Sequence, residues 1–288
     1  MLQVLASAIP LAAMYALVAV GFVIVYRSTK VLNFAQGQLT LLGAYLCYSC
    51  VILFGGHFYP GFLLACVGAA VIGIFIYRVF LRSFVALDPL LAVMITIVLA
   101  TLIASIYSMT WGSSPLSLAE PFASRGIHLG AGVVISTLDI ATVVAAIMLI
   151  AGLLALLRWT RFGLAMRAAA ESPTLASYRN VNVTRVAAAS WAIALVTAAI
   201  AGIAYSLKTQ IDPSSIALGT ATFPAILIGG LDSIGGVLVG SVALAVIDQI
   251  VSTYVGGGWT DAIAYLVLLG VLLVRPNGLF GSKLPVRL

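Results

Sequence analysis

The stretch RWTRFGLAMRAAAESPTLASYRNVNVTR, residues 158–185, is a polar interruption in a chain that is otherwise mostly apolar. Against the single acid Glu171 it carries five arginines: Arg158, Arg161, Arg167, Arg179 and Arg185. Residues 163–171 are rich in helix formers, and Arg167 and Glu171 are four apart, which places them on one helix face. Ser172 and Pro173 then predict an N-cap and the first position of a second short helix that ends near Arg179. We therefore expect a helix, bend, helix unit.

Two interpretations of residues 158–185 are open from the residues alone. The stretch is either a solvated cytoplasmic loop, kept inside by its positive charge, or a docking element for a soluble partner. Both interpretations place it between two transmembrane spans.

The composition of the chain assigns its class. Of 288 residues, 63% are apolar and 8% are charged, against about 25% charged residues in a soluble domain. The net charge of +6 does not indicate nucleic-acid binding, because the basic residues punctuate hydrophobic runs and form no exposed groove. Residues 1–26 lack the basic start and short apolar core of a cleaved signal peptide, so we expect a retained first span. We expect an all-α polytopic membrane protein.

Apolar runs of about the length that crosses a bilayer divide the chain. They lie near residues 4–26, 39–54, 60–77, 90–110, 137–157, 186–207, 217–231, 234–254 and 260–274. Because the runs 39–54 and 217–231 are short, we expect eight or nine transmembrane or re-entrant helices in one transmembrane domain, 1–288. The segment 111–136 contains Pro and Gly and is expected to be an irregular external loop.

Basic residues give the predicted orientation. With residues 158–185 in the cytoplasm, only Arg125 and Lys208 of the 14 basic residues fall outside. The cytoplasmic set is Arg27, Lys30, Arg78, Arg82, Arg158, Arg161, Arg167, Arg179, Arg185, Arg275, Lys283 and Arg287. We therefore expect an external N-terminus and a cytoplasmic C-terminus.

Two segments break the apolar pattern at membrane depth. NFAQGQLTLLGAY, residues 33–45, and GTATFPAILIGGLDSIGGVLVG, residues 219–240, lie in the two halves of the chain. Such paired breaks indicate a translocation pathway, although close helix packing explains the same glycines, including the Gly236 and Gly240 pair. The pathway candidates are Asn33, Gln36, Gly37, Gln38, Gly229, Gly230, Asp232, Gly235 and Gly236. The acid Asp232 is also a candidate turn or cap residue at the cytoplasmic edge, and Asp248 is an acid inside the run 234–254.

Metal and catalytic sites are disfavoured. Cys47, Cys50 and Cys66 lie inside apolar runs, and no second pair follows the Cys47 and Cys50 spacing, so we expect buried thiols and no metal site. A hydrolytic set could be composed from Ser190, His128 and Asp139, but no nucleophile elbow or HExxH motif supports it.

The chain also lacks the motif that binds a nucleotide phosphate. No G-x-x-x-x-G-K-[ST] loop is present, so a chain that drives uptake with ATP would need a separate ATPase. No Asp, Glu or Lys pairs recur near span centres, as a proton-coupled carrier would need. An ATP-independent carrier or facilitator channel for a small polar solute remains the alternative to an ATP-driven permease.

Four motifs in series carry a family resemblance. NFAQGQLTLLGAY, TRFGLAMRAAAESPTLASYRNVNVTRV, FPAILIGGLDSIGGVLVG and the closing RPNGLFG resemble the membrane permease subunits of branched-chain amino acid type ABC importers. The resemblance covers nearly the whole chain. It implies half of a permease dimer in a bacterial inner membrane, beside a related second permease. It further implies two cytoplasmic ATPase subunits that use ATP and Mg, and a periplasmic binding protein that delivers the substrate.

The resemblance also assigns residues to ATPase coupling. Arg161, Gly163, Arg167 and Glu171 match the family's coupling loop, in which Ser172 and Pro173 form the bend, and Asn182 and Arg185 match its closing Asn-x-x-Arg. The chain departs from the family pattern at four positions: Gln36 and Gln38 replace His and Glu, Asn180 replaces Gly, and Ala221 replaces Lys. These departures leave the substrate open among branched-chain and other amino acids, urea or amides, and aromatic acids.

Overall fold

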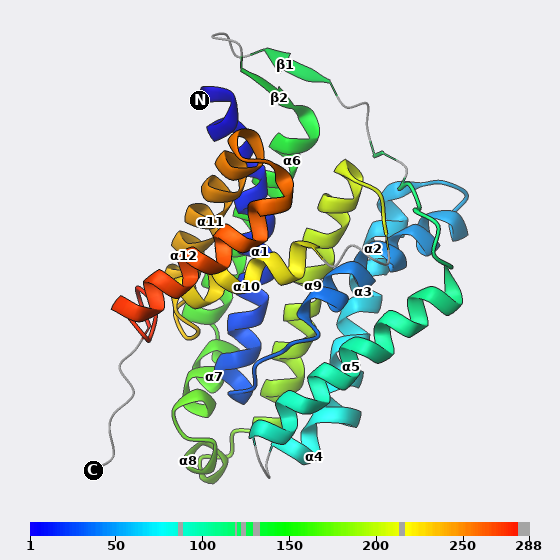
Figure 1. Cartoon of the computed structure of the whole chain (residues 1–288). Helices are drawn as coiled ribbons and strands as arrows, with labels where there is room; N and C mark the ends of the chain where they lie inside the picture. The colour runs from blue at the N-terminus through cyan, green and yellow to red at the C-terminus, as the bar shows by residue number, and fades with distance from the viewer. Residues whose placement is uncertain (86–88, 119, 122–124, 129–132, 213–216, 282–288) are drawn as a thin grey trace.

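The computed structural model describes residues 1–85, 89–118, 120–121, 125–128, 133–212 and 217–281 (Figure 1). Lys283 and Arg287 of the predicted cytoplasmic set lie outside these residues. In the first part of the chain the helices are α1 (Leu2–Thr29), α2 (Gln36–Leu53), α3 (Phe58–Ile76), a π-helical turn (Tyr77–Leu81), α4 (Arg82–Val85) and α5 (Pro89–Thr110). They are followed by α6 (Thr137–Trp159), α7 (Arg161–Glu171), α8 (Pro173–Tyr178), α9 (Val183–Lys208), α10 (Ala217–Gly229), α11 (Ile234–Tyr254), a 3₁₀ turn (Gly257–Trp259) and α12 (Thr260–Val274).

The fold class predicted from composition is confirmed. Within the described residues, eight helices are long and apolar enough to cross a membrane, and the segment Leu218–Gly229 is shorter. The predicted run 39–54 becomes a full 18-residue helix, because α2 begins earlier, at Gln36, among polar residues that hydropathy excludes. Helix α10, with 13 residues, is too short to span about 30 Å at 1.5 Å per residue, as expected of a re-entrant segment.

Helix α1 is the centre of the molecule. Of its most apolar window, 83% is buried, and it packs against α11, α9, α6 and α10. A helix that is apolar on every side suits either a protein interior or lipid, so it is the packing of these four neighbours that buries α1. By contrast, 11% of the α12 window and 22% of the α6 window are buried, which places these helices at the rim.

Helix α9 packs closely through small residues. Gly21 on α1, Gly43 on α2 and Gly73 on α3 each abut the α9 backbone, where a Cβ would collide with Ala194, Ala199 or Trp191. Without a hydrophobic driving force between helices in lipid, such close backbone approach supplies the van der Waals contact that holds the bundle.

The segment 111–136 differs from its expected irregular form. Strands β1 (Gly126–His128) and β2 (Val134–Ser136) pair antiparallel, with Ile127 opposite Ile135. They lie at the end of the molecule where α1 begins, opposite α7 and α8 (Figure 1). Three-residue strands are too short to show the alternation by which a strand is read from sequence.

Candidate functional site

The predicted helix, bend, helix unit is confirmed by α7 and α8. Thr160 caps α7 by accepting a hydrogen bond from Gly163 N at 3.2 Å. Ser172 caps α8 by accepting from Leu175 N at 3.3 Å, and Pro173 occupies the first turn. The two helices therefore form a capped unit at the end of the bundle.

One side of α7 attaches the unit to the bundle. Gly163, Met166 and Ala169 are buried, and the helix packs against α6, α9 and α1. A Cβ at Gly163 would collide with the Leu157 carbonyl, so the turn from α6 into α7 requires glycine at this position. This packing fixes the position of the outer surface.

Large apolar side chains lie on that outer surface. Leu164, Leu175 and Tyr178 are 62%, 66% and 82% exposed. These three residues were not among the predicted coupling residues. With Trp159, they are the large apolar side chains of residues 158–185 that are exposed in the structure. An apolar surface on a segment outside the spanning helices is typical of a protein contact.

The other coupling candidates have structural partners. Arg167 donates Nη1 to the Leu157 carbonyl at 2.9 Å, and the described residues show no ion pair between Arg167 and Glu171. Asn182 caps α9 by accepting from Arg185 N at 3.0 Å. Arg161, Glu171 and the Arg185 side chain are exposed. The matching Asn-x-x-Arg therefore acts locally as a helix cap.

The first polar break forms a compact knot beside the middle of α1. Asn33 accepts from Ala35 N at 3.1 Å and donates Nδ2 to Gln36 Oε1 at 3.0 Å. Gln36 Nε2 in turn donates to the Val18 carbonyl at 3.4 Å. Both side chains are buried, at 0% and 1% exposed, so they satisfy groups that the break would leave unpaired in hydrocarbon.

Next to this knot the two predicted breaks meet. A Cβ at Gly219 on α10 would overlap the Gly37 Cα on α2, and the rings of Phe34 and Phe223 stack with centroids 5.1 Å apart. A small crevice at the contact is bordered by Gly37, Gly219 and polar groups of α2 and α9, including Thr40 and Ser206. The structure thus joins the starts of the two segments.

Gln38 differs from its neighbours in the knot. Its side chain is 5% exposed, its backbone carbonyl accepts from the Tyr107 hydroxyl, and its Oε1 has no partner among the described residues. Among the described residues of the first break, its amide oxygen and the Tyr45 hydroxyl are the buried side-chain atoms left without a hydrogen bond.

The later glycines of the second break lie elsewhere and form a helix crossing. Gly229 on α10 and Gly236 on α11 would each collide with the other's backbone if they carried a Cβ. Gly230 has a φ of 106°, and Phe280 N donates to the Gly229 carbonyl at 3.1 Å. Residues 279–280 therefore pack on this crossing, which supports the packing explanation for these glycines.

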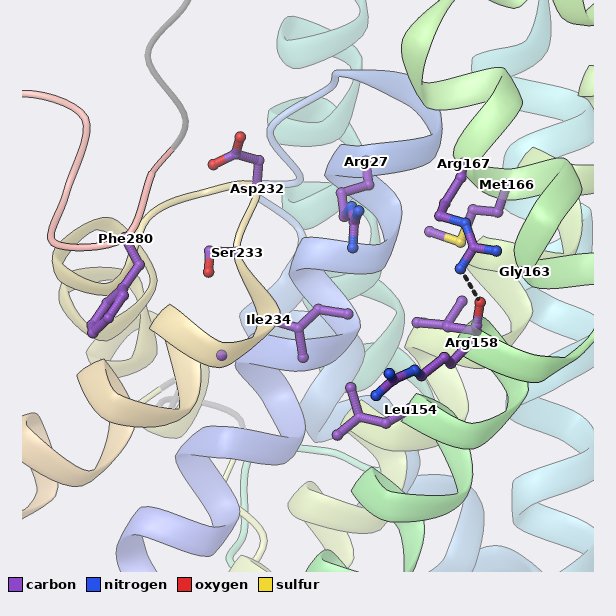
Figure 2. Close-up of a pocket in the computed structure, with 12 residues that line it drawn as sticks. Arg27, Leu154, Arg158, Gly163, Met166, Arg167, Asp232, Ser233, Ile234 and Phe280 are labelled. Atoms are coloured by element: carbon purple, nitrogen blue, oxygen red, sulfur yellow. Dashed lines mark hydrogen bonds between the residues drawn. The ribbon is translucent and has the colours of Figure 1, made fainter.

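Asp232 and Gly235 border a different space. With Ser233, which caps α11, they line a cavity at the end of the bundle that carries α7 (Figure 2). Asp232 therefore lies in the turn before a helix, and the pathway candidates fall into two groups at opposite ends of α10.

A buried ionisable pair, which no sequence motif indicated, links α1 and α11. Tyr15 on α1 donates its hydroxyl to Asp248 Oδ2 on α11 at 2.7 Å, and Asp248 is 4% exposed. Its Oδ1 has no partner among the described residues. The only sequence signal was an acid inside an apolar run.

The structure does not bring together the hydrolytic set considered from the sequence, Ser190, His128 and Asp139. Asp139 pairs with Lys208 at 2.5 Å, at the end of α9 that lies about 27 Å along the helix from Ser190. The described residues hold no group of three or more metal-ligating side chains; Cys47 is buried, and Cys50 and Cys66 are half-buried.

Comparison with known proteins identifies the family. The family described as "Branched-chain amino acid transport system / permease component" matches residues 4–274. The permease protein LivH of Escherichia coli is 28% identical over 97% of this chain and 95% of its own length. BraD of Pseudomonas aeruginosa is 27% identical with the same coverage, and a probable LivH of Methanocaldococcus jannaschii is 26% identical over 97% and 92%. The chain therefore belongs to the permease components of branched-chain amino acid ABC importers, as a multi-pass inner-membrane transport subunit that works within a larger system.

Proposed function

We propose that this chain forms half of the translocation pathway for a branched-chain or related amino acid. A related second permease completes the pathway, two cytoplasmic ATPase subunits bind ATP and Mg, and a periplasmic binding protein delivers the substrate. LivH of Escherichia coli and BraD of Pseudomonas aeruginosa are high-affinity branched-chain amino acid permeases, which supports this substrate class. Nothing in the comparisons supports the carrier or channel alternative.

The proposed coupling to an ATPase rests on the unit formed by α7 and α8. Its capped helices are attached to α1, α6 and α9 on one side and turn Leu164, Leu175 and Tyr178 outward on the other. An element that is packed to the spanning helices moves with them, so a partner that grips its outer surface can transmit a conformational change. We propose that an ATPase subunit binds this surface, with the C-terminus of the permease on the same cytoplasmic side.

The meeting point of α2 and α10 is the proposed part of the pathway. Gly37 and Gly219 border its crevice. Gln38, the next residue of α2, does not line the crevice, but its Oε1 is buried without a partner among the described residues. Uncharged amides and hydroxyls suit transient contact with a zwitterionic solute better than tight binding. The later group, Gly229, Gly230 and Gly236, is assigned to helix packing instead.

Glu171→Lys tests the docking surface. Glu171 is exposed and has no ion pair among the described residues, so the substitution should leave expression and membrane insertion unchanged. An exposed ion pair on a helix contributes only about 0.3–0.5 kcal/mol to stability in any case. The reversed charge would oppose a partner surface that meets a carboxylate, so we expect loss of uptake and of ATPase capture in a pull-down.

The control is Glu120→Lys, which makes the same charge change on an exposed residue outside α7 and α8. It should retain uptake and ATPase capture. Normal uptake by Glu171→Lys would leave the stretch a solvated loop. Full transport by the purified chain in liposomes without ATPase or ATP would favour an autonomous carrier.

A further inference from the structure

A basic cavity opens at the end of the bundle where α7 lies. It has a volume of about 670 Å³ and lies between the last turns of α1 and α6 and the first turn of α11. Arg27, Arg158 and Arg167 line it from α1, α6 and α7, and Asp232 is the only acid among the described residues that line it. Figure 2 shows the Arg27 and Arg158 side chains extending toward the space before α11, with the Asp232 carboxylate turned away from them.

Two of these arginines have neither an ion pair nor a side-chain hydrogen bond within the described residues. No carboxylate lies within 4.0 Å of Arg27, Arg158 or Arg167 there, and only Arg167 donates a side-chain hydrogen bond, to the Leu157 carbonyl. Several like charges converging on one cavity raise its potential and favour an anion. Arg27 and Arg158 are therefore available to a bound anionic group.

An apolar groove leads away from the cavity along α1, α6 and α11. Its volume is about 270 Å³, and its 13 lining residues are all Leu, Ala, Ile or Val from α1, α6 and α11. Ala12 and Ala146 are buried in it, while Ile147 on α6 and Val242 on α11 are 62% and 54% exposed at its sides. Small residues on α1 thus make the floor, and larger ones on the flanking helices make the walls.

The groove and the basic cavity are adjacent. On α6 the groove reaches Ile150 and the cavity begins at Leu154, while on α11 the groove reaches Leu238 and the cavity includes Gly235. Each step is about one helical turn, or roughly 5 Å. On α1 the step from Ala16 to Arg27 is longer, about 16 Å. Along α6 and α11 the two spaces therefore form one strip, basic at the membrane edge and apolar within the hydrocarbon.

We propose that this strip binds one anionic phospholipid, with its phosphate between Arg27 and Arg158 and an acyl chain in the groove over α1. A soluble anion would use the arginines but not the apolar groove. Arginine side chains in the last turn of a spanning helix reach the headgroup level, where basic pockets between helices bind anionic headgroups. The site adjoins the inner side of α7 through Gly163, Met166 and Arg167, whereas the outward-facing Leu164, Leu175 and Tyr178 do not line it.

Lipid retention tests the site. The full-length chain is purified in mild detergent, mixed with equal amounts of phosphatidylglycerol and phosphatidylcholine of the same acyl chains, and examined by native mass spectrometry. We expect wild-type protein to retain phosphatidylglycerol preferentially. The double variant Arg27→Gln, Arg158→Gln should lower that preference roughly thirtyfold, since each arginine near a membrane surface strengthens anionic binding about fivefold. Arg78→Gln, an exposed basic residue outside the cavity, should retain it.

The groove has its own variant. Ala13→Phe should fill the groove and reduce retention of both long-chain lipids, whereas Val71→Phe, at an exposed position of α3 outside it, should not. Equal thermal melting temperatures in phosphatidylcholine would show that the variants are folded.

Three results would overturn the proposal. The first is equal retention of the two lipids by wild type, or an unchanged preference in the double variant. The second is displacement of the lipid by inorganic phosphate at comparable concentration, which would indicate a soluble-anion site. The third is lipid bound to the lone chain but absent from the assembled importer, which would make the groove a contact between subunits.

Discussion

Asn33 and Gln36 replace, with side chains, hydrogen bonds that a regular helix would make with its backbone. The chain leaves α1 at Thr29 and begins α2 only at Gln36, beside the middle of α1, where little water reaches the backbone. The two amides bond to each other, to Ala35 N and to the Val18 carbonyl. Irregular backbone is stable at this depth because protein groups satisfy it.

This arrangement separates the expected effects of two neighbouring substitutions. Gln36→Leu removes two hydrogen bonds, the one that Asn33 Nδ2 donates to Gln36 Oε1 and the one that Gln36 Nε2 donates to the Val18 carbonyl. Each buried group left unsatisfied costs about 1–3 kcal/mol. We expect a lower folded yield and a lower melting temperature. Gln38→Leu removes an amide oxygen that has no partner among the described residues, so its melting temperature should stay near wild type.

Transport then distinguishes the roles of the two glutamines. If Gln38 contacts the solute, Gln38→Leu should lower uptake per folded molecule, measured with radiolabelled leucine in membranes of matched permease content. Wild-type uptake by this variant would remove Gln38 from the pathway. A Gln36→Leu protein as stable as wild type would contradict the hydrogen bonding described for the knot.

The backbone conformation at Asn180 explains why this residue can replace the glycine of the family pattern. Its φ is 65°, in the left-handed region that glycine adopts freely and asparagine tolerates better than other residues. The substitution of Asn for Gly therefore keeps the turn between α8 and α9, and it carries no information about the substrate.

Close contacts between helices depend on glycines whose role sequence alone left open. A Gly pair in an apolar run indicates a pathway break or a helix contact equally well, because both need a backbone without a side chain. The structure separates them: Gly37 and Gly219 meet at a crevice, whereas Gly229 and Gly236 cross without one. The caps at Ser172 and Pro173 were predictable, since a cap depends on residues only three positions apart.

The contact between α2 and α9 is expected to be the most sensitive of these. A Cβ at Gly43 would overlap the Cα and Cβ of Ala199; α9 cannot shift without disturbing α1, and α2 cannot shift without disturbing α3. We expect Gly43→Val to destabilise the protein by at least about 1–3 kcal/mol, seen as a lower melting temperature and less monodisperse protein after detergent extraction.

Gly68→Val is the matched control, because the nearest atom to a Cβ there is Leu46 Cδ1, at 3.9 Å. It makes the same substitution on a membrane helix and should leave the melting temperature nearly unchanged. Equal losses in the two variants would mean that the cost comes from valine in a helix and not from the α2 and α9 contact.

At the scale of the whole molecule, charge separates the two ends of the bundle. Arg27, Arg158 and Arg167, which are far apart in sequence, line one cavity near α7, whereas Lys208 pairs with Asp139 at the other end, near β2. Counting basic residues along the sequence predicted this division, because each end of a spanning helix faces one side of the membrane. The strip between α6 and α11 could not be predicted in the same way, since it depends on how three helices lie around each other.

The direction of the bundle in the membrane is the last prediction. If the arginine-rich end is cytoplasmic, a cysteine at Ser177, on α8, is shielded in intact spheroplasts, while a cysteine at Ser117 is accessible; both positions are exposed in the structure. An impermeant maleimide should therefore label Ser117→Cys and not Ser177→Cys until the membrane is permeabilised. The parent chain, with its native Cys47, Cys50 and Cys66 in the spanning helices, gives the background. Labelling of Ser177→Cys alone in intact spheroplasts would show that the protein has the opposite orientation, with α7 and α8 out of reach of a cytoplasmic ATPase.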